Sequence, residues 1–518
     1  MSDTPRKSGF GELLANLRAL PRNLTASINR RSSGESARGR SQSVFGNVFL
    51  HIHSVRTHRW TLRPRFTMGL GVASGVLFLM LVVSGAVLMV HYVPSVSGAY
   101  NSVKNIHFVV PGGRVIRNLH RWAAYGMVVA VFLHMVRVFY TNSYKSPREF
   151  NWIIGVILFV LTLGLAFTGY CLPWDQLAYW AITIGANIAG SPAEVTDAIG
   201  ITDMIDIGGF QKLLMLGSNT PGESALLRFY WGHCVVLPLA MVMFLAAHFW
   251  RIRKDGGLSR PDDIRDEELI GTPCDPLAEE VFKPETKTYG LMCLVKDRSG
   301  NVNRGPERTV LSWPHVLRAE VAIAMILLAI MLLLAIFIDA PLKEMANPSV
   351  PENPAKAPWY FLAMQEVISY SAFSGGMVLP GITVLMLMMI PYLDRREGGT
   401  GRWFGVPGDR RLAIGSAIAM AVAVVSMLTF TVKVGWLRDW FPDTNQILIT
   451  TVNPGTVLAA FTTLLTLGAL MVTGSTRKSA IVFFTCFLVS FVILTYFALV
   501  HRGPNWDFYW WPSLWPTH

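Results

Sequence analysis

Charged side chains are scarce in this chain of 518 residues. Asp, Glu, Lys and Arg make up 15% of it, whereas apolar residues make up 52%, and the mean hydropathy is +0.40. A soluble domain is usually about 25% charged, so this composition excludes an ordinary water-soluble globule. Several runs approach or exceed the roughly 20 apolar residues that cross a bilayer as a helix. The sequence therefore predicts an all-α polytopic membrane protein.

Cysteine patterns and an N-terminal signal are also missing. The five cysteines form no C-x-x-C or C-x-x-C-H pattern, so we predict no disulfide framework, zinc site or covalent c-type haem motif. The polar, arginine-rich first 44 residues contain no apolar run, which argues against a signal peptide. The net charge of +12 does not indicate nucleic acid, because Lys and Arg concentrate in the inner loops of membrane proteins.

Nine apolar segments are candidate membrane spans. The connections after the second, fourth, sixth and eighth segments are basic and fall on the same side as the arginine-rich N-terminus. The positive-inside rule then predicts an N-terminus inside and a C-terminus outside, in a bacterial-type inner membrane. The segments lie at about 66–92, 119–140, 151–171, 229–250, 317–338, 377–393, 412–433, 456–474 and 479–500.

Four histidines lie inside two of these segments. His120 and His134 are 14 residues apart in "RNLHRWAAYGMVVAVFLHMVR", and His233 and His248 are 15 apart in "FYWGHCVVLPLAMVMFLAAHF". Each interval spans about 21–22 Å of helix. Both segments run from outside to inside, so the first members share an outer depth and the second members an inner depth. A single histidine usually bonds a neighbour, but two stacked bis-imidazole sites favour two electron-transferring b-type haems.

Arginines near these histidines fit the same interpretation. Arg117, Arg121 and Arg137 lie within a turn of a predicted ligand. Haem propionates are anionic and need such partners. Snorkelling at the membrane edge explains Arg121 equally well.

Glycine spacing repeats the histidine interval. Gly71 and Gly85 are 14 residues apart in the first segment, and Gly155 and Gly169 are 14 apart in the third. A helix beside two flat macrocycles needs a missing side chain at each haem depth. Small residues in membrane helices also simply allow close helix contact, so the match of the intervals is what supports haem packing.

Six stretches carry a family resemblance. "RNLHRW", "FLHMVR", "GYCLPWDQLAYWA", "RFYWGHCVVLPL", "HFWRIRKDG" and "NPAKAPWYF" closely resemble cytochrome b of the quinol–cytochrome c oxidoreductase (cytochrome bc) family, over about residues 45–395. The second histidine spacing and the "HRW" and "PWDQ" details look more like the chloroplast-type branch. In that branch the later spans form a separate polypeptide, whereas here they are fused to the first half.

The resemblance implies a mechanism. Quinol would be oxidised near the outer face, giving one electron to a Rieske iron–sulfur protein. The other would cross through the outer haem (His120, His233) and the inner haem (His134, His248) to a quinone near the inner face, with proton translocation. A homodimer, a c-type cytochrome partner and bound membrane lipid are also expected. The outer quinol site would include Tyr170, Pro173, Trp174, Asp175, Trp359 and Tyr360.

The expected organisation follows. A four-helix dihaem bundle should be followed by about five further transmembrane helices. The predicted parts are a polar arm at 1–44, a dihaem cytochrome b domain at 45–260, an inner loop at 261–316, a quinol-site half at 317–395, additional helices at 396–500 and an outer aromatic tail at 501–518.

The chain also departs from the family pattern. The outer-site "PEWY" reads "APWY" here, without its glutamate, so Glu366 is our predicted proton acceptor, with Asp175 as competitor. No cysteine begins the first span, so we expect no covalent extra haem. For the inner quinone site, Val316 stands where an acid is expected, and a cluster of Arg253 with His315 or Glu320 is predicted instead. A basic loop that binds lipid headgroups would explain Arg253 nearly as well.

Two other classes compete with this reading. A dihaem membrane anchor of another quinone-linked dehydrogenase would also place histidines on membrane helices, but would lack the "PWDQ" and "PWY" elements. A haem-free transporter would fit the Gly- and Pro-interrupted segments, but gives the paired histidine spacing no role.

Overall fold

The computed structural model describes residues 18–21, 37–47, 50–274, 308–395 and 398–516. The chain divides into two compact units. Unit 1 comprises Met1–Arg63, Arg253–Gly257 and Arg265–Val321, and unit 2 comprises the rest. Most of the predicted arm at 1–44 and the central part of the predicted loop at 261–316 lie outside the described residues.

The described ranges contain nine helices that are long and apolar enough to cross a membrane, which confirms the predicted all-α architecture. Most of the structured helix ends fall within a few residues of the predicted ones, and the fourth and seventh helices are longer at 32 residues each. They are α4 (Leu70–His91), α6 (Gly113–Tyr140), α7 (Glu149–Tyr170), Glu223–Lys254 (α11, η3 and α12), α14 (Ser312–Phe337), Ser374–Leu393 (η6 and α16), Asp409–Trp440 (α17 and α18), α20 (Pro454–Thr473) and α21 (Thr476–Val500).

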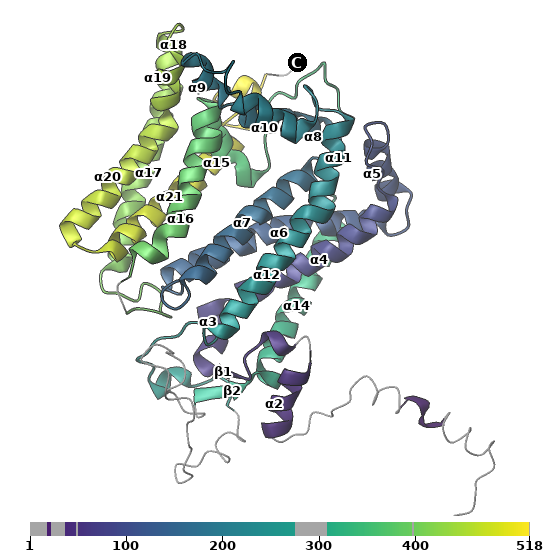
Figure 1. The fold of residues 1–518 in the computed structure, drawn as a ribbon, viewed down its shortest axis with the longest axis vertical. Coiled ribbons are helices and arrows are strands. Elements are labelled where there is room, and N and C mark those ends of the chain that lie inside the picture. Colours follow the sequence, from purple (N-terminus) through teal and green to yellow (C-terminus); the bar gives the residue numbers. More distant parts are fainter. Residues whose placement is uncertain (1–17, 22–36, 48–49, 275–307, 396–397, 517–518) are drawn as a thin grey trace, which may run out of the picture. The chain divides into compact units, whose positions relative to one another are not determined.

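The first part of unit 2 is a bundle of α4, α6, α7 and α12 (Leu237–Lys254) (Figure 1). Leu77 of α4 and Ala123 and Met127 of α6 share one buried apolar cluster with Met331 of α14. A second cluster joins α7 to α12 around Met241. Burying these apolar side chains stabilises the bundle by roughly 1.5–3 kcal/mol for each large residue that is fully covered.

Short helices cover one end of this bundle. They are α5 (Ala99–Phe108), α8 (Gln176–Gly190) and α10 (Ile207–Leu216), whereas α9 (Ala193–Ala198) packs on α19 (Gln446–Thr451). Cys171, Trp174 and Ile182 form a buried cluster with Leu216 and Leu226 there. The side chain of Asp175 accepts the N–H of Ala178 and so begins α8, which is the usual role of an N-terminal capping aspartate.

The second half of unit 2 packs α15 (Trp359–Ile368), α16 (Leu379–Leu393), α17 (Asp409–Lys433), α20 and α21 together (Figure 1). The core shared by α15, α17, α20 and α21 includes Met420, Val424, Leu458 and Val482, and α16 packs into a separate cluster through Leu387 and Ile390. Helices α20 and α21 form an antiparallel pair, because Gly474 adopts φ +58° at the end of α20 and Ser475 caps α21. That turn requires the left-handed backbone that glycine adopts without strain.

Unit 1 contains a small antiparallel sheet that the sequence did not predict. Strand β1 (Arg56–His58) pairs with β2 (Thr309–Leu311), with Thr57 opposite Val310. Around it lie η1 (Leu50–Ile52), η2 (Arg59–Leu62), η4 (Asp266–Leu269) and the beginning of α14. Strands of three residues are too short for an alternating pattern to be recognisable.

Candidate haem and quinone sites

The outer pair of histidines, so named from the predicted orientation, meets across a gap. His120 lies on α6 and His233 on the π-helical turn η3 (Gly232–Val236). Their ring centroids are 6.2 Å apart and the ring planes are inclined at 77°. A metal–imidazole bond is about 2 Å long, so two imidazoles on opposite sides of one ion have centroids about 6 Å apart. The spacing fits one six-coordinate iron between the rings.

Hydrogen bonds hold both outer imidazoles by the same nitrogen. Nδ1 of His120 is 2.9 Å from the hydroxyl of Ser84 on α4. Nδ1 of His233 is 3.1 Å from the carbonyl of Leu165 and 3.2 Å from the hydroxyl of Thr168, both on α7. A proton held on Nδ1 leaves Nε2 free to bind a metal. This arrangement would suit each imidazole to bind a metal ion through Nε2.

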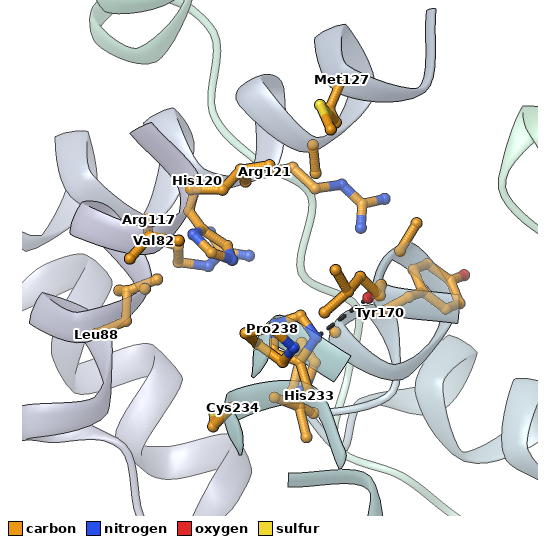
Figure 2. A pocket seen from close by; sticks show the side chains of 18 of the residues that line it. Val82, Leu88, Arg117, His120, Arg121, Met127, Tyr170, His233, Cys234 and Pro238 are labelled. Atoms are coloured by element: carbon orange, nitrogen blue, oxygen red, sulfur yellow. Dashed lines mark hydrogen bonds between the residues drawn. The ribbon is translucent and has the colours of Figure 1, made fainter. Parts of the chain in front are cut away.

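A cavity of about 360 Å³ lies beside this pair, within the range typical of ligand pockets. Figure 2 shows His120 and His233 facing the space between their helices, with Arg121 and Tyr170 beside it. Both histidines are partly exposed although protein atoms surround them, because their rings border this cavity. The wall also includes Arg117, Gly85, Gly169, Pro173 and Tyr360.

Three of the four predicted glycines lie directly against a histidine ring. A Cβ on Gly85 would be 3.2 Å from Cε1 of His120, and one on Gly169 only 2.5 Å from Cε1 of His233. A Cβ on Gly71 would be 3.2 Å from Cε1 of His134. The fourth, Gly155, has no described heavy atom within 4 Å of its Cβ position. The first three thus admit the imidazoles, and Gly155 borders open space.

The inner pair is His134 on α6 and His248 on α12. The two imidazoles are close enough to interact electrostatically. Nδ1 of His248 is buried and has no hydrogen-bond partner among the described residues. Nη2 of Arg137 is 3.4 Å from Nδ1 of His134.

Arg137 is a buried cation. Its side chain is 4% exposed and lies over the ring of Phe66, and its Nε has no hydrogen-bond partner among the described residues. Burying a charge without an opposite charge is costly. The site is therefore suited to an anionic group such as a haem propionate.

The outer arginines have different partners. Arg117 donates to the carbonyls of Ala340 and Pro341, so it holds the segment after α14 against α6. Arg121 donates to the hydroxyl of Tyr125 at 2.7 Å and lies over the rings of Tyr125 and Tyr170. Its Nε is also buried without a partner in the described part of the chain. Since it lines the cavity, Arg121 does not reach out of the bundle as a snorkelling side chain would.

Asp175 links the "PWDQ" stretch to a distant loop. Its oxygens accept the N–H of Ala178 at 2.9 Å and of Lys343 at 3.0 Å. Burial raises the pKa of Asp175 above its ordinary value, although the two N–H donors and the charge of Arg121 oppose this effect. The preceding Trp174 adopts φ +52° and is buried. Asp175 is thus a carboxyl group at the edge of the outer site.

The "PWY" residues reach the same cavity from α15. The ring of Tyr360 packs edge-on against Tyr125 at 6.0 Å and lines the cavity. Trp359 packs edge-on against Tyr360 at 5.4 Å. Residues more than two hundred positions apart therefore meet beside His120 and His233.

Glu366 has partners that sequence reasoning missed. It is 1% exposed, and its oxygens accept bonds from Nε of Arg502 at 3.0 Å and from Nε1 of Trp506 at 3.0 Å. It is not among the residues that line the cavity. The one sequence signal was an arginine, Arg502, directly after an apolar span.

The predicted inner quinone residues lie in unit 1. Glu320 accepts a hydrogen bond from Nε2 of His53 at 2.8 Å, and Arg253 donates to the carbonyl of His51. Burial lowers the pKa of His53, but Glu320 outweighs it and the net pKa is raised. His315 lies in the first turns of α14. The structure thus adds His53 to this group.

Comparison with known proteins places the chain in a family. The model of the family "Cytochrome b/b6/petB" matches residues 63–256. Cytochrome b6 of Heliobacterium mobile is 46% identical over 179 residues, which are 35% of this chain and 78% of the relative. Cytochrome b6 of Heliomicrobium gestii is 40% identical over 204 residues, 39% of this chain and 88% of the relative.

A solved structure shares the fold over nearly the whole length. A chain of "Hyperthermophilic respiratory Complex III" aligns with a TM-score of 0.52 and 20% identity, covering 94% of this chain and 98% of that chain. The b6-like part is therefore followed by further helices within one known architecture. With most of the length of cytochrome b6 matched at 40–46% identity, this integral membrane protein belongs to the cytochrome b/b6 family.

Proposed function

We propose that the chain is the cytochrome b subunit of a quinol–cytochrome c oxidoreductase. It oxidises quinol at an outer-face site and passes electrons through two b haems to a quinone at the inner face, coupled to proton translocation. The observation that carries this proposal is the outer histidine pair at 6.2 Å, beside a cavity that Tyr170 and Tyr360 also line. An electron carrier and a quinol pocket would thus share one wall.

Two histidine pairs would bind the two haems, and arginines would bind the haem propionates. His120 and His233 would bind the outer one through Nε2, and His134 and His248 the inner one. Arg117 and Arg121 line the cavity, and Arg121 and Arg137 each have a buried Nε without a hydrogen-bond partner among the described residues. These three arginines would therefore neutralise the propionates. When bound, the haems supply reversible one-electron transfer with no open axial position.

Outer-site residues would bind quinol and accept its protons. Tyr170, Pro173 and Tyr360 belong to the cavity wall, Trp359 packs against Tyr360, and Trp174 packs against Tyr179 of α8. Asp175 is our preferred proton acceptor, because a carboxyl group with a raised pKa works nearer to physiological pH; neither Asp175 nor Glu366 is among the residues that line the cavity. The oxygens of Glu366 are already engaged by Arg502 and Trp506.

For the inner quinone site we propose Arg253 with His315 or Glu320, as expected from the sequence. The hydrogen bond between His53 and Glu320 adds a further protonatable side chain to this group. Such a pair could supply protons to a reduced quinone.

The assembly is proposed from the fold. The solved structure with a similar fold is a chain of a respiratory Complex III. This similarity supports our proposal that a Rieske protein and a c-type cytochrome are partners and that the chain forms a homodimer in lipid. We propose an N-terminus inside and a C-terminus outside. Two non-covalent haems and no covalent one are expected.

Copurification and an assay of quinol oxidation together test this proposal. The tagged chain, purified from its membrane in mild detergent, should bring a Rieske protein and a c-type cytochrome with it and reduce that cytochrome with quinol. A dihaem anchor of another dehydrogenase would instead copurify with a flavin- or metal-containing catalytic subunit and leave the cytochrome oxidised. That result would overturn the proposal.

A further inference from the structure

The chain after α21 folds into a compact tail. Arg502 and Phe508 form an antiparallel bridge, and the N–H of Tyr509 donates to the carbonyl of His501 at 2.8 Å. The ring of His501 packs against Phe508, whose ring also stacks on Phe497 of α21. Residues 501–516 are thus an ordered element. We call them the tail.

The tail contacts segment 353–366 at three points. Side chains of Asn353 and Asn505 bond each other at 2.7 Å, and the N–H of Asn505 also donates to Asn353. Lys356 donates to the carbonyl of Leu499 at 2.8 Å and lies over the ring of Trp515. These two contacts hold the segment just before "APWY".

The third contact is a buried ion pair. Arg502 binds Glu366 with Nε and Nη2, and its guanidinium lies over Phe497. Glu366 also accepts the indole N–H of Trp506, while Nη1 of Arg502 donates to the carbonyl of Trp506. Glu366 is 1% and Arg502 9% exposed. Paired, two-pronged geometry of this kind fixes orientation as well as distance.

The contacts enclose the residues that face the cavity. Ala357, Pro358, Trp359 and Tyr360 lie between Lys356 and Glu366. The side chain of Gln365 holds the backbone before Pro358 against α15, since it accepts the N–H of Ala357 and donates to the carbonyl of Ala355. Tyr360 is the member that lines the cavity. Its position therefore depends on anchors before and after it, and both are supplied by the tail region.

We propose that the tail is a positioning device for the outer quinol site, with Arg502 as its central positioning residue and Glu366 as the anchor point. This proposal rests on the proposed function of that site. It assigns to Glu366 a positioning role in place of the proton-accepting role predicted from the sequence. A carboxylate held by a guanidinium and an indole N–H is kept where it is and has few free acceptor positions.

The experiment uses the full complex with Arg502→Gln, Glu366→Gln, the double variant and, as control, Arg438→Gln at an exposed arginine bonded to Gln446. We expect KM for quinol to rise about tenfold in each single variant, because small misplacement of binding groups is costly. Haem content and the shape of the pH profile should stay those of the parent. The double variant should be no worse than either single one, and Arg502→Lys should recover part of the loss.

The following results would contradict these expectations. If Glu366→Gln alters the pH profile of kcat while Arg502→Gln does not, Glu366 accepts the proton and the proposal fails. If Arg502→Gln does not assemble, Asn505→Gly decides: it removes the side-chain contact to Asn353, keeps the left-handed backbone of Asn505 (φ +57°) without the strain that alanine would add, and should raise KM about twofold. A parent KM in Asn505→Gly and in every assembled Arg502 variant would overturn the proposal. A parent complex that oxidises no quinol would refute the proposed function instead.

Discussion

At the residue scale, small groups decide what the histidines can bind. Ser84 and Leu165 contact Nδ1 of the outer imidazoles, and both histidines line the cavity. Gly85 and Gly169 leave room for the rings. A hydroxyl, a carbonyl and two missing side chains together produce the ligand geometry, because an imidazole needs both a fixed tautomer and space to be an axial ligand.

The glycines provide a matched series. Leucine at Gly155 or Gly169 should impair haem insertion more than leucine at Gly164. Gly169 is against His233, and Gly155 borders open space in which we propose that the inner haem lies, whereas a Cβ on Gly164 would only make ordinary contact with Leu237. Overpacking costs about 1–3 kcal/mol. Haem content per chain is the measurement, and equal content in all three variants would leave the glycines an ordinary packing role.

Asp175 should control the pH dependence of quinol oxidation. The deprotonated carboxylate accepts the proton, so the rate should rise with pH as Asp175 ionises. Its raised pKa places that rise above the ordinary aspartate value of about 3.9. Asp175→Asn should be slow and lack the rise, although asparagine still caps α8.

The control is Glu366→Gln, which should keep the pH profile of the parent. If Asp175→Asn retains the parent rate and profile, the residue is only a helix cap. If Glu366→Gln is slow and loses the rise with pH instead, the assignment of the acceptor is reversed.

At the element scale, the π turn η3 reconciles the unequal histidine spacings. In a regular helix 15 residues overshoot four turns by about 60°, while 14 fall short by about 40°. In η3 the N–H of Leu237 bonds the carbonyl of Gly232, five residues back. A π turn accommodates one extra residue. The interval from His233 to His248 therefore acts like the 14-residue interval of α6.

Pro238 explains why the turn is there. A proline clashes with the carbonyl four residues before it in an α-helix, and a π turn widens the helix at that point. The second π turn, η6 (Ser374–Val378), likewise ends two residues before a proline, Pro380. Pro238→Ala should let the segment relax toward a regular α-helix and turn His233 away from His120.

We therefore expect Pro238→Ala to lose outer haem selectively, measured as haem per chain and by redox titration. Pro380→Ala makes the same change at a π turn without a haem ligand, so it should retain both haems. Full outer haem in Pro238→Ala would show that the π turn does not position His233.

At the scale of the whole molecule, buried charges join the b6-like part to the later helices. Arg477 of α21 donates to the hydroxyl of Tyr144 at 2.7 Å and pairs with Asp409 of α17 at 3.3 Å. The hydroxyl of Tyr144 donates to Asp394 at 2.6 Å. Arg477 and Asp409 are 2% and 0% exposed. The added helices are thus fixed to the haem bundle by a polar cluster as well as by apolar packing.

Arg477→Met should destabilise this junction by about 3–5 kcal/mol, since it leaves a buried carboxylate without its counterion. The measurement is the midpoint temperature at which the haem spectrum is lost in detergent. Arg410→Met, at an exposed arginine of the same helix as Asp409, should leave the midpoint near that of the parent. Equal midpoints for both variants would contradict the role of the cluster.

Helix number and the histidine pairs could be predicted from sequence because they depend on local patterns: apolar length and fixed spacing. The partner of Glu366 could not, since Arg502 is 136 positions away and nothing local relates the two. The same holds for His53 and Glu320, and for the three-residue strands of unit 1. The π turn at His233 was missed because periodicity arguments assume one regular helix.

Haem content of histidine variants tests the central claim most directly. The purified chain should contain two b haems, resolved in a reduced-minus-oxidised titration. His120→Ala or His233→Ala should each remove the outer haem and leave the inner one, because each removes one of two ligands at 6.2 Å ring spacing. Loss of the inner haem alone in either variant, or two haems in both, would contradict the pairing of His120 with His233.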